Sequence, residues 1–359
     1  MSISQSASII SDIARAFAHS AEHEFRNASP LYERLATGVS KDRELLALAA
    51  HAISKPVPMI FFAAVHYLLL NGEAHPLAAY FPDITAARNA PDVPDGDPYD
   101  IFREFCLDHR TELERIISTY HVQTNEVRRC ACLLPAFAMV SAQTKGLPLA
   151  LVEIGASAGL NLLWDHYGYD FGNGIFCGDR ASSVQMTCTL KGDGKPPFPA
   201  TLPQIASRWG LDFHPIDVRD LSATNWLRAF IWPEQKARFD LLSRAIEVAR
   251  CHPPQLLAGD ALDLLPTVIS ATPPEHALCL FHTFVSNQMS EEGRDRLACL
   301  IAGGGRERDI SCISIDFSEG YPRLDLLSYK DGVKTHRRLA NCSGHSRWLE
   351  WLDRGNEEK

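Results

Sequence analysis

The sequence lacks several features that would assign it to a specialised class of protein. Lys and Arg number 35 against 44 Asp and Glu, so no basic excess is present to displace counterions, and non-specific nucleic-acid binding is not expected. The longest apolar run, Val57–Leu70, is shorter than the roughly 20 residues that span a bilayer. The N-terminus does not resemble a signal peptide, because Asp12 and Arg15 interrupt its apolar residues.

The ten cysteines do not follow a disulfide or zinc-binding pattern. No C-x-x-C pair occurs, and Cys130 and Cys132 are too close for a usual zinc site. The H-x-x-x-H formed by His19 and His23 lacks the glutamate of a zincin and any third ligand, so no metal site is predicted. We therefore expect a reduced, soluble, cytoplasmic protein without a membrane segment.

Length and composition predict two globular domains. The chain has 359 residues, of which 46% are hydrophobic and 22% are charged. Apolar residues recur at helical spacing through residues 1–145, which predicts an all-helical N-terminal domain. Within it, Val57–Leu70 predicts a buried helix, Asp83–Pro98 a loop, and Phe102–Tyr120 and Asn125–Thr144 two further helices.

From about residue 146 the pattern changes to alternating strands and helices, which predicts an α/β domain with a parallel sheet. An irregular insertion at about 168–210 interrupts it, and a hairpin around Lys330-Asp331-Gly332 ends it. A parallel sheet that ends in antiparallel pairing resembles the class I methyltransferase fold. We therefore predict a Rossmann-like sheet of that type in residues 146–359. The expected strands of the sheet are, in order, Leu149–Ile154, Phe213–Val218, Gln255–Ala258, Ala277–Phe281 and Ile310–Phe317, and a further strand, Val184–Leu190, is expected within the insertion. The expected helices are Leu160–Tyr167, Glu234–Arg250 and Glu291–Ile301.

The residues Gly155–Gly159, called the glycine turn below, follow the first of these strands. Two glycines four residues apart allow a sharp backbone turn and leave room for a ligand. The N-terminus of the next helix would offer N–H groups to a carboxylate or phosphate, as in nucleotide-binding α/β folds. The same residues also match G-x-S-x-G, the turn that presents a nucleophilic serine in α/β-hydrolases. Two functions are therefore open for this turn.

A serine hydrolase would need several strands and an oxyanion-hole loop before Ser157, followed by Asp and His. The upstream residues predict helices instead and contain no His-Gly-Gly segment. Downstream, Asp260 or Asp263 with His336 or His345 keeps the required order. That is weak support, because a chain with 14 histidines nearly always offers such a residue.

A methyltransferase would need the glycine turn, then an acid after the second strand for the ribose hydroxyls, then a polar residue after the third for the adenine amine. Asp217 and Asp260 meet the last two requirements in order. Glu153 would orient the turn or meet the ammonium of the methionine moiety, although Arg129 could be its structural partner instead. Ser157, Asn161 and Asn125 could also be simple helix caps. The predicted residues for S-adenosylmethionine are Glu153, Gly155, Ser157, Gly159, Asn161, Asp217, Asp260 and Asn125.

Several segments resemble a bacterial family known only as a domain of unknown function, which is grouped with S-adenosylmethionine-dependent methyltransferases. They are Val152–Leu162, Ser29–Tyr32, Gln123–Glu126, Leu227–Pro233 and Gly344–Trp348. The resemblance implies a methyltransferase-like fold but no particular reaction. Many amino-methylating enzymes carry an Asp/Asn-Pro-Pro-Tyr-like motif where this chain has His282-Thr283, which argues against N-methylation of a base or amide.

His282 follows the expected fourth strand, at the edge where open α/β sheets place ligands. It is the candidate catalytic base, because imidazole titrates near neutral pH. His345 and Arg347 could contact an acidic substrate or begin the last helix. We expect a small-molecule acceptor and leave a homo-oligomer open. A non-catalytic cofactor-binding protein remains the third alternative.

Overall fold

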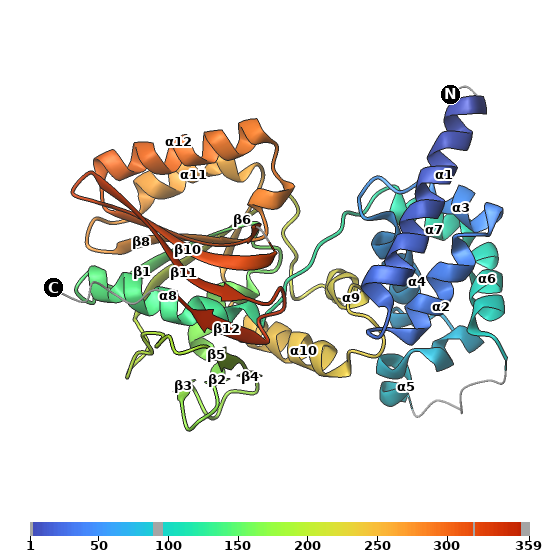
Figure 1. The fold of residues 1–359 in the computed structure, drawn as a ribbon, viewed down its shortest axis with the longest axis horizontal. Helices are drawn as coiled ribbons and strands as arrows, with labels where there is room; N and C mark the ends of the chain where they lie inside the picture. Colours follow the sequence, from blue (N-terminus) through green and yellow to red (C-terminus); the bar gives the residue numbers. More distant parts are fainter. Residues whose placement is uncertain (1–2, 89–95, 319, 353–359) are drawn as a thin grey trace. The chain divides into compact units, whose positions relative to one another are not determined.

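The computed structural model describes residues 3–88, 96–318 and 320–352. The chain divides into two compact units, one of residues 1–124 with 219–243 and one of 125–218 with 244–359. This division differs from the predicted boundary at residue 145 in two respects. Helix α8 (Arg129–Gln143) belongs to the second unit, and α9 (Leu221–Ala229) belongs to the first although it lies between two strands in the sequence. Figure 1 labels the helices and strands of both units.

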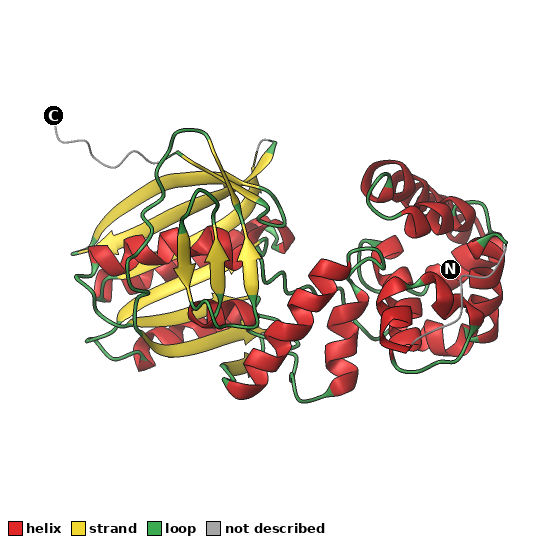
Figure 2. Cartoon of the chain, turned by 90° about the horizontal axis from the view of Figure 1, so that it is seen from below, coloured by secondary structure: helices red, strands yellow, loops and turns green. Residues whose placement is uncertain are grey.

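The first unit is helical, and Figure 2 shows strands only in the second unit among the described residues. Its centre is α4 (Val57–Leu70), which is buried on nearly all sides and confirms the prediction for these residues. No helix in the described part of the chain is long and apolar enough to cross a membrane. The other elements are α1 (Ile3–His19), η1 (Ser20–Phe25), α2 (Pro30–Val39), α3 (Arg43–Ala49), η2 (Pro76–Tyr80), α5 (Pro82–Arg88), α6 (Pro98–Asp108) and α7 (Arg110–Ile117).

Two predictions for the first unit were wrong in detail. The helix expected at Phe102–Tyr120 is two helices, α6 and α7, because the backbone of His109 between them is not helical (φ −101°, ψ 19°). Helix α5 occupies part of the expected loop Asp83–Pro98, and residues 89–95 of that loop lie outside the described residues. A buried pair joins α4 to α5, since His66 Nε2 lies 2.7 Å from Asp83 Oδ2.

The second unit contains a nine-stranded sheet in the order β5-β12-β11-β10-β9-β8-β1-β6-β7. Strands β7, β6, β1, β8 and β9 are parallel, and β10, β11 and β12 follow in antiparallel pairs. The chain leaves β1 for β6 and β7 on one side and returns to β8 on the other, so the strand order reverses between β1 and β8. The strands are β1 (Leu149–Ile154), β5 (Thr189–Lys191), β6 (Ile205–Asp212), β7 (Gln255–Ala258), β8 (Ala277–Thr283), β9 (Ile310–Ser318), β10 (Tyr321–Lys330), β11 (Val333–Cys342) and β12 (Trp348–Trp351).

Helices cover both faces of this sheet (Figure 1). Helices α11 (Ala261–Ala271) and α12 (Glu291–Glu307) cover one face, where Val152 and Leu280 belong to a cluster that includes residues of both helices. Helix α8 covers the other face, where the rings of Phe137 and Phe281 lie 5.2 Å apart. Successive residues of a strand point to opposite faces. Val152 and Leu280 therefore face α11 and α12, while Glu153 and Phe281 face α8.

The expected strands at the centre of the sheet and the terminal hairpin are confirmed. Strands β1 and β7 have the predicted limits, and β8 and β9 extend the predicted ones by one or two residues. Asp331 and Gly332 join β10 to β11 with φ angles of 50° and 75°. Positive φ angles at both residues of a two-residue turn match the twist of a hairpin. Helix α10 (Lys236–Cys251) agrees with the predicted helix to within two residues.

Three local predictions in the second unit were wrong. The second parallel strand is Ile205–Asp212 and not Phe213–Val218, because Asp212 Oδ1 accepts the His214 N–H at 2.9 Å and closes a turn there. The segment Val184–Leu190 divides into β4 (Gln185–Thr187) and β5, which belong to different sheets. The chain after His345 enters β12 and not a helix. Strand β4 pairs with β2 (Gly168–Asp170), which also pairs with β3 (Phe176–Gly178).

Candidate functional site

The glycine turn has left-handed backbone at alternate residues. The φ angles are 72° at Gly155, 52° at Ser157 and 69° at Gly159. A non-glycine residue in this region costs roughly 1 kcal/mol or more, so the surroundings must hold Ser157 in place. They do so through Asp212, whose Oδ2 accepts the Ser157 N–H at 2.8 Å, and through Asn125, whose Oδ1 accepts the Leu160 N–H at 3.1 Å.

The turn does not form the anion cradle that the sequence suggested. The expected helix Leu160–Tyr167 is a seven-residue 3-10 helix, η3 (Leu160–His166), with a kink at Leu163. The amides of Gly155 and Gly159 donate to the carbonyls of Leu211 and Ala156. Most N–H groups that would face a phosphate therefore already have acceptors within the protein.

Gly155 and Gly159 are required by the packing around them as well as by their positive φ angles. A Cβ atom at Gly155 would lie 2.5 Å from Val285 Cγ2, and one at Gly159 would lie 2.7 Å from Pro254 Cγ. These contacts fix the glycine turn against the chain that follows β8 and against the chain that precedes β7. The two glycines therefore define the shape of the turn, and side chains around it supply the polar groups.

Glu153 is the most unusual of these side chains. It is 1% exposed, and its Oε1 accepts a hydrogen bond from Asn161 Nδ2 at 3.1 Å. No group among the described residues forms a hydrogen bond with its Oε2. Burial raises the pKa of Glu153 to about 8, against the opposing effects of the Asn161 amide and the Arg129 charge. A carboxyl group with this pKa is mostly protonated at pH 7.

A cation lies at the same edge of the sheet. Arg129, at the start of α8, donates from Nη1 to Thr283 Oγ1 at 3.0 Å, and its guanidinium carbon lies 4.4 Å from the centre of the Phe284 ring. Thr283 ends β8, the strand beside β1. The structure therefore brings Glu153, Asn161, Asn125 and the glycine turn together where the strand order reverses. Open α/β sheets bind their ligands at this point.

The acid at the end of the second parallel strand is Asp212 and not Asp217. Asp212 is the last residue of β6 and holds the glycine turn, whereas Asp217 is an exposed residue of the following loop. The strand prediction was wrong because Phe213 and Ile216 are apolar residues of a loop and not of a strand. The run Trp209-Gly210-Leu211 followed by an acid is the signal in the sequence that could have identified the correct strand.

Asp260 has a structural role at the end of β7. Its Oδ1 accepts the Leu262 N–H at 2.8 Å, so it caps the N-terminus of α11. The preceding Gly259 donates its N–H to the Asp212 carbonyl at 2.9 Å, which keeps the ends of β6 and β7 together. Asp260 therefore lies one strand beyond Asp212. Its role as the N-cap of α11 accounts for an acidic residue at this position without a bound ligand.

His282 lies on the opposite face of the sheet from Glu153. It pairs with Ile154 of β1, one residue after Glu153, and so points toward the face covered by α11 and α12. His282 is 5% exposed, and its Nδ1 lies 3.5 Å from Asp316 Oδ2. Burial lowers the pKa of His282, although the Asp316 charge acts in the other direction. Burial also raises the pKa of Asp316.

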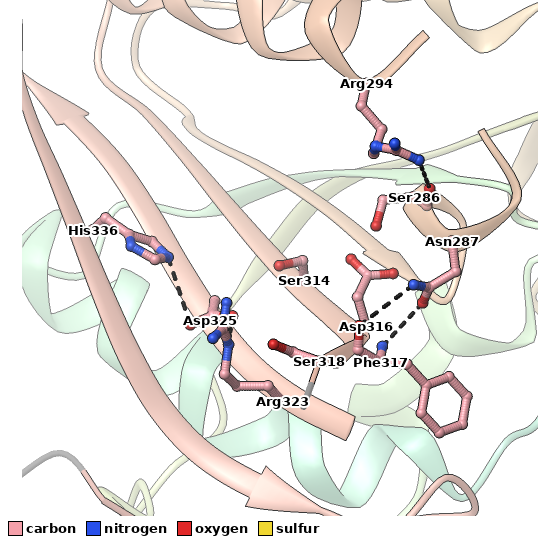
Figure 3. Close-up of a pocket in the computed structure, with 10 residues that line it drawn as sticks. All are labelled: Ser286, Asn287, Arg294, Ser314, Asp316, Phe317, Ser318, Arg323, Asp325 and His336. Carbon is pink, nitrogen blue, oxygen red and sulfur yellow. Dashed lines mark hydrogen bonds and ion pairs between the residues drawn. The ribbon is translucent and has the colours of Figure 1, made fainter. Parts of the chain in front are cut away.

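Asp316 lines a polar pocket of about 380 Å³, shown in Figure 3. The pocket lies where β9 ends and β10 begins, beside the short helix η4 (Ser286–Gln288). The sequence could have indicated this pocket, because Asp316 is an acidic residue near the end of a predicted strand. Its lining residues are Ser286, Asn287, Arg294, Ser314, Asp316, Phe317, Ser318, Arg323, Asp325 and His336.

The residues of a Ser-Asp-His triad are not assembled. The Ser157 hydroxyl is buried and has no hydrogen-bond partner in the described part of the chain, so no histidine is positioned to take its proton. His336 lies 3.5 Å from Asp325, and His345 lies 3.1 Å from Glu126. Asp263 forms an ion pair with Arg296 on the surface. The structure therefore gives no support to the hydrolase interpretation.

The described residues contain no group of three or more His, Cys, Asp or Glu that could hold a metal ion. His19 and His23 stack with ring centroids 4.3 Å apart on the surface of the first unit. His23 Nδ1 lies 3.1 Å from the His19 carbonyl oxygen. The H-x-x-x-H pattern is thus explained by contacts within one helical segment.

The sequence pattern of a protein family described as "Uncharacterized protein conserved in bacteria (DUF2332)" matches residues 14–351. The matched range includes the glycine turn, Asp212 and the polar pocket. No curated protein and no solved structure matches the chain.

Proposed function

The chain belongs to this family of uncharacterized bacterial proteins, and we propose that it is an S-adenosylmethionine-dependent methyltransferase acting on a small molecule. The observation that carries the proposal is the position of the site. Numbered along the chain, the parallel strands lie in the order 3-2-1-4-5, which is the Rossmann-like order. The glycine turn, Glu153 and Asp212 lie at the carboxyl ends of its first and second strands.

The side chains at this edge fit the polar groups of that cofactor. Glu153 Oε2 is a buried oxygen without a hydrogen bond among the described residues, and the ammonium of the methionine moiety would supply a donor and a positive charge. Arg129 offers the opposite charge for the carboxylate of the same moiety. Asp212 accepts the backbone N–H groups of Ser157 and His214, and the carboxylate at the end of β6 is of the chemical type that accepts ribose hydroxyls.

When bound, S-adenosylmethionine supplies an electrophilic methyl group. The contribution of this chain would be mainly alignment of the acceptor, because positioning accounts for much of the rate of a displacement between two bound molecules. His282 would hold a proton from the acceptor. Burial lowers its pKa, which favours the neutral imidazole that can take up a proton, and Asp316 Oδ2 lies 3.5 Å from its Nδ1.

Calorimetric titration with S-adenosylmethionine and S-adenosylhomocysteine tests the cofactor. We expect wild type to bind both and Asp212→Asn to bind at least about tenfold more weakly, since it loses the charge that faces the ribose. Asp217→Asn, which changes an exposed acid five residues later, is the matched control and should bind like wild type. Thermal melting of each variant separates loss of binding from loss of fold. Absence of binding by folded wild type would refute the proposal.

A further inference from the structure

The polar pocket has an imbalance between its donors and its acceptors. Its cationic side chains already have partners within the protein. Arg294 Nη1 donates to the carbonyls of Met289 at 2.8 Å and Ser286 at 3.4 Å. Arg323 Nε donates to Asp325 Oδ2 at 2.7 Å. The Asn287 amide is also used, because it donates to and accepts from the backbone of Phe317.

Its acceptors are less well satisfied. Ser286 hydrogen-bonds to Asp316 and Arg323 to Asp325, but one oxygen of each carboxylate, Oδ1, is buried and accepts no hydrogen bond from any described residue. Asp325 is 8% exposed, and the imidazole Nε2 of His336 lies 3.5 Å from its Oδ1. The His282 Nδ1 behind Asp316 likewise has no hydrogen bond in the described part of the chain. Buried carboxylate oxygens without donors are costly, so the pocket favours a ligand that brings donors.

Charge decides which kind of donor fits. Arg323 forms an ion pair with Asp325, and Arg294 donates to two carbonyls. Asp316 has hydrogen bonds from Ser286, and its nearest charged partner among the described residues is His282, whose pKa burial lowers. The negative charge of Asp325 also adds to the raised pKa of Asp316. A hydroxyl would supply a hydrogen bond but no charge. An ammonium supplies three donors and a positive charge.

Figure 3 shows the carboxylate of Asp316 and the hydroxyl of Ser314 in the same space, with the ring of Phe317 pointing away. His282 and Ser314 are paired residues of β8 and β9, and Asp325 is the partner of Ser314 on β10. Three neighbouring strands therefore present polar side chains on one face. The volume of about 380 Å³ lies at the small end of ligand pockets.

We propose that this pocket binds a small aliphatic amine as its ammonium ion, between Asp316 and Asp325. The inference rests on the proposed function for one further step, in which the amine is the methyl acceptor. In that role one N–H proton passes to the Asp316–His282 pair, the nitrogen forms the new bond to carbon, and the sulfur keeps the electron pair of the bond that breaks. The amine is neither a nucleobase nor an amide.

Ligand-observed NMR with matched pairs of probes tests the pocket without the cofactor. The probes are ethanolamine against ethylene glycol and benzylamine against benzyl alcohol, each pair differing in the amine. We expect at least one amine to bind at least about tenfold more tightly than its alcohol. Asp316→Asn and Asp325→Asn should each remove most of that preference, while Asp263→Asn, a surface acid of the same unit, should keep it.

Equal binding of amine and alcohol, or an amine preference that survives in both pocket variants, would overturn the proposal, as would no binding of either amine. Because the variants replace carboxylates by amides of the same shape, thermal melting should show that both fold. The experiment contains no S-adenosylmethionine, so its failure is separate from failure of the methyltransferase proposal. If the protein binds the amine but not the cofactor, the pocket is an amine-binding site but not the site of a methyl acceptor.

Discussion

Replacing Glu153 by Gln should stabilise the protein, and the gain should grow with pH. The buried carboxyl has a pKa of about 8, above its ordinary value of 4.5. The native state therefore holds a proton on Glu153 at pH values where the unfolded chain has lost it. Stability must then fall as pH rises from about 4.5 to 8, because the unfolded state binds fewer protons than the native state.

The size of the effect follows from the shift. A pKa raised from 4.5 to about 8 lowers the free energy of unfolding by roughly 5 kcal/mol once Glu153 is ionised in both the native and the unfolded state. At pH 7 the loss is about 3 kcal/mol. Gln has the shape of the protonated acid and keeps a carbonyl for the Asn161 amide, but it adds a buried N–H that costs about 1–3 kcal/mol if it finds no acceptor. The change with pH is therefore a cleaner measure than the absolute difference.

Denaturant unfolding of wild type and Glu153→Gln at pH 5, 7 and 8.5 gives the free energy of unfolding at each pH. We expect the difference, variant minus wild type, to rise by several kcal/mol between pH 5 and 8.5. Glu307→Gln, at an exposed position of α12, is the matched control for the same chemical change. A difference that stays constant or falls over this range would refute the assignment of Glu153 as a buried protonated acid.

Three further predictions concern stability and the thiols. Gly155→Ala should lower the free energy of unfolding by about 2–3 kcal/mol, since it adds a methyl group 2.5 Å from a valine carbon at φ 72°, whereas Gly174→Ala, at φ 79° with open space, should cost only about 1 kcal/mol. Equal losses in thermal denaturation would contradict this. Asp83→Ala leaves Nε2 of the fully buried His66 without its partner and should cost about 3 kcal/mol by denaturant titration, with a loss below about 1 kcal/mol counting against the pair. Titration with a thiol reagent should find two fast groups, Cys251 and Cys299, and all ten cysteines in denaturant without reductant; fewer than ten would indicate a disulfide.

Local pattern predicted much of the second unit. Strand β1 and strand β7 are short apolar runs that end at glycines, and their limits were predicted to the residue. Strand β6 was missed because Arg208 and Gly210 interrupt its apolar residues while Phe213 and Ile216 lie just beyond it. The acid at the end of the second strand was the candidate for the ribose hydroxyls, so this displacement made Asp217 the candidate in place of Asp212.

Two features could not be predicted from local pattern at all. Periodicity can indicate that a segment is helical, but it does not indicate which unit the helix belongs to. It therefore could not show that α8 packs on the sheet while α9 belongs to the first unit. The pairing of His282 with Asp316 depends on the register between β8 and β9. Single-sequence patterns indicate strands but not which residues of two strands are neighbours.

The most direct test of the central claim is a crystal structure of the protein with S-adenosylhomocysteine. The account predicts the amino-acid end of the ligand beside Glu153 and Arg129 and the ribose hydroxyls on Asp212, at the carboxyl ends of β1 and β6. Ligand bound elsewhere on the chain, or a glycine turn left empty at saturating ligand, would contradict it.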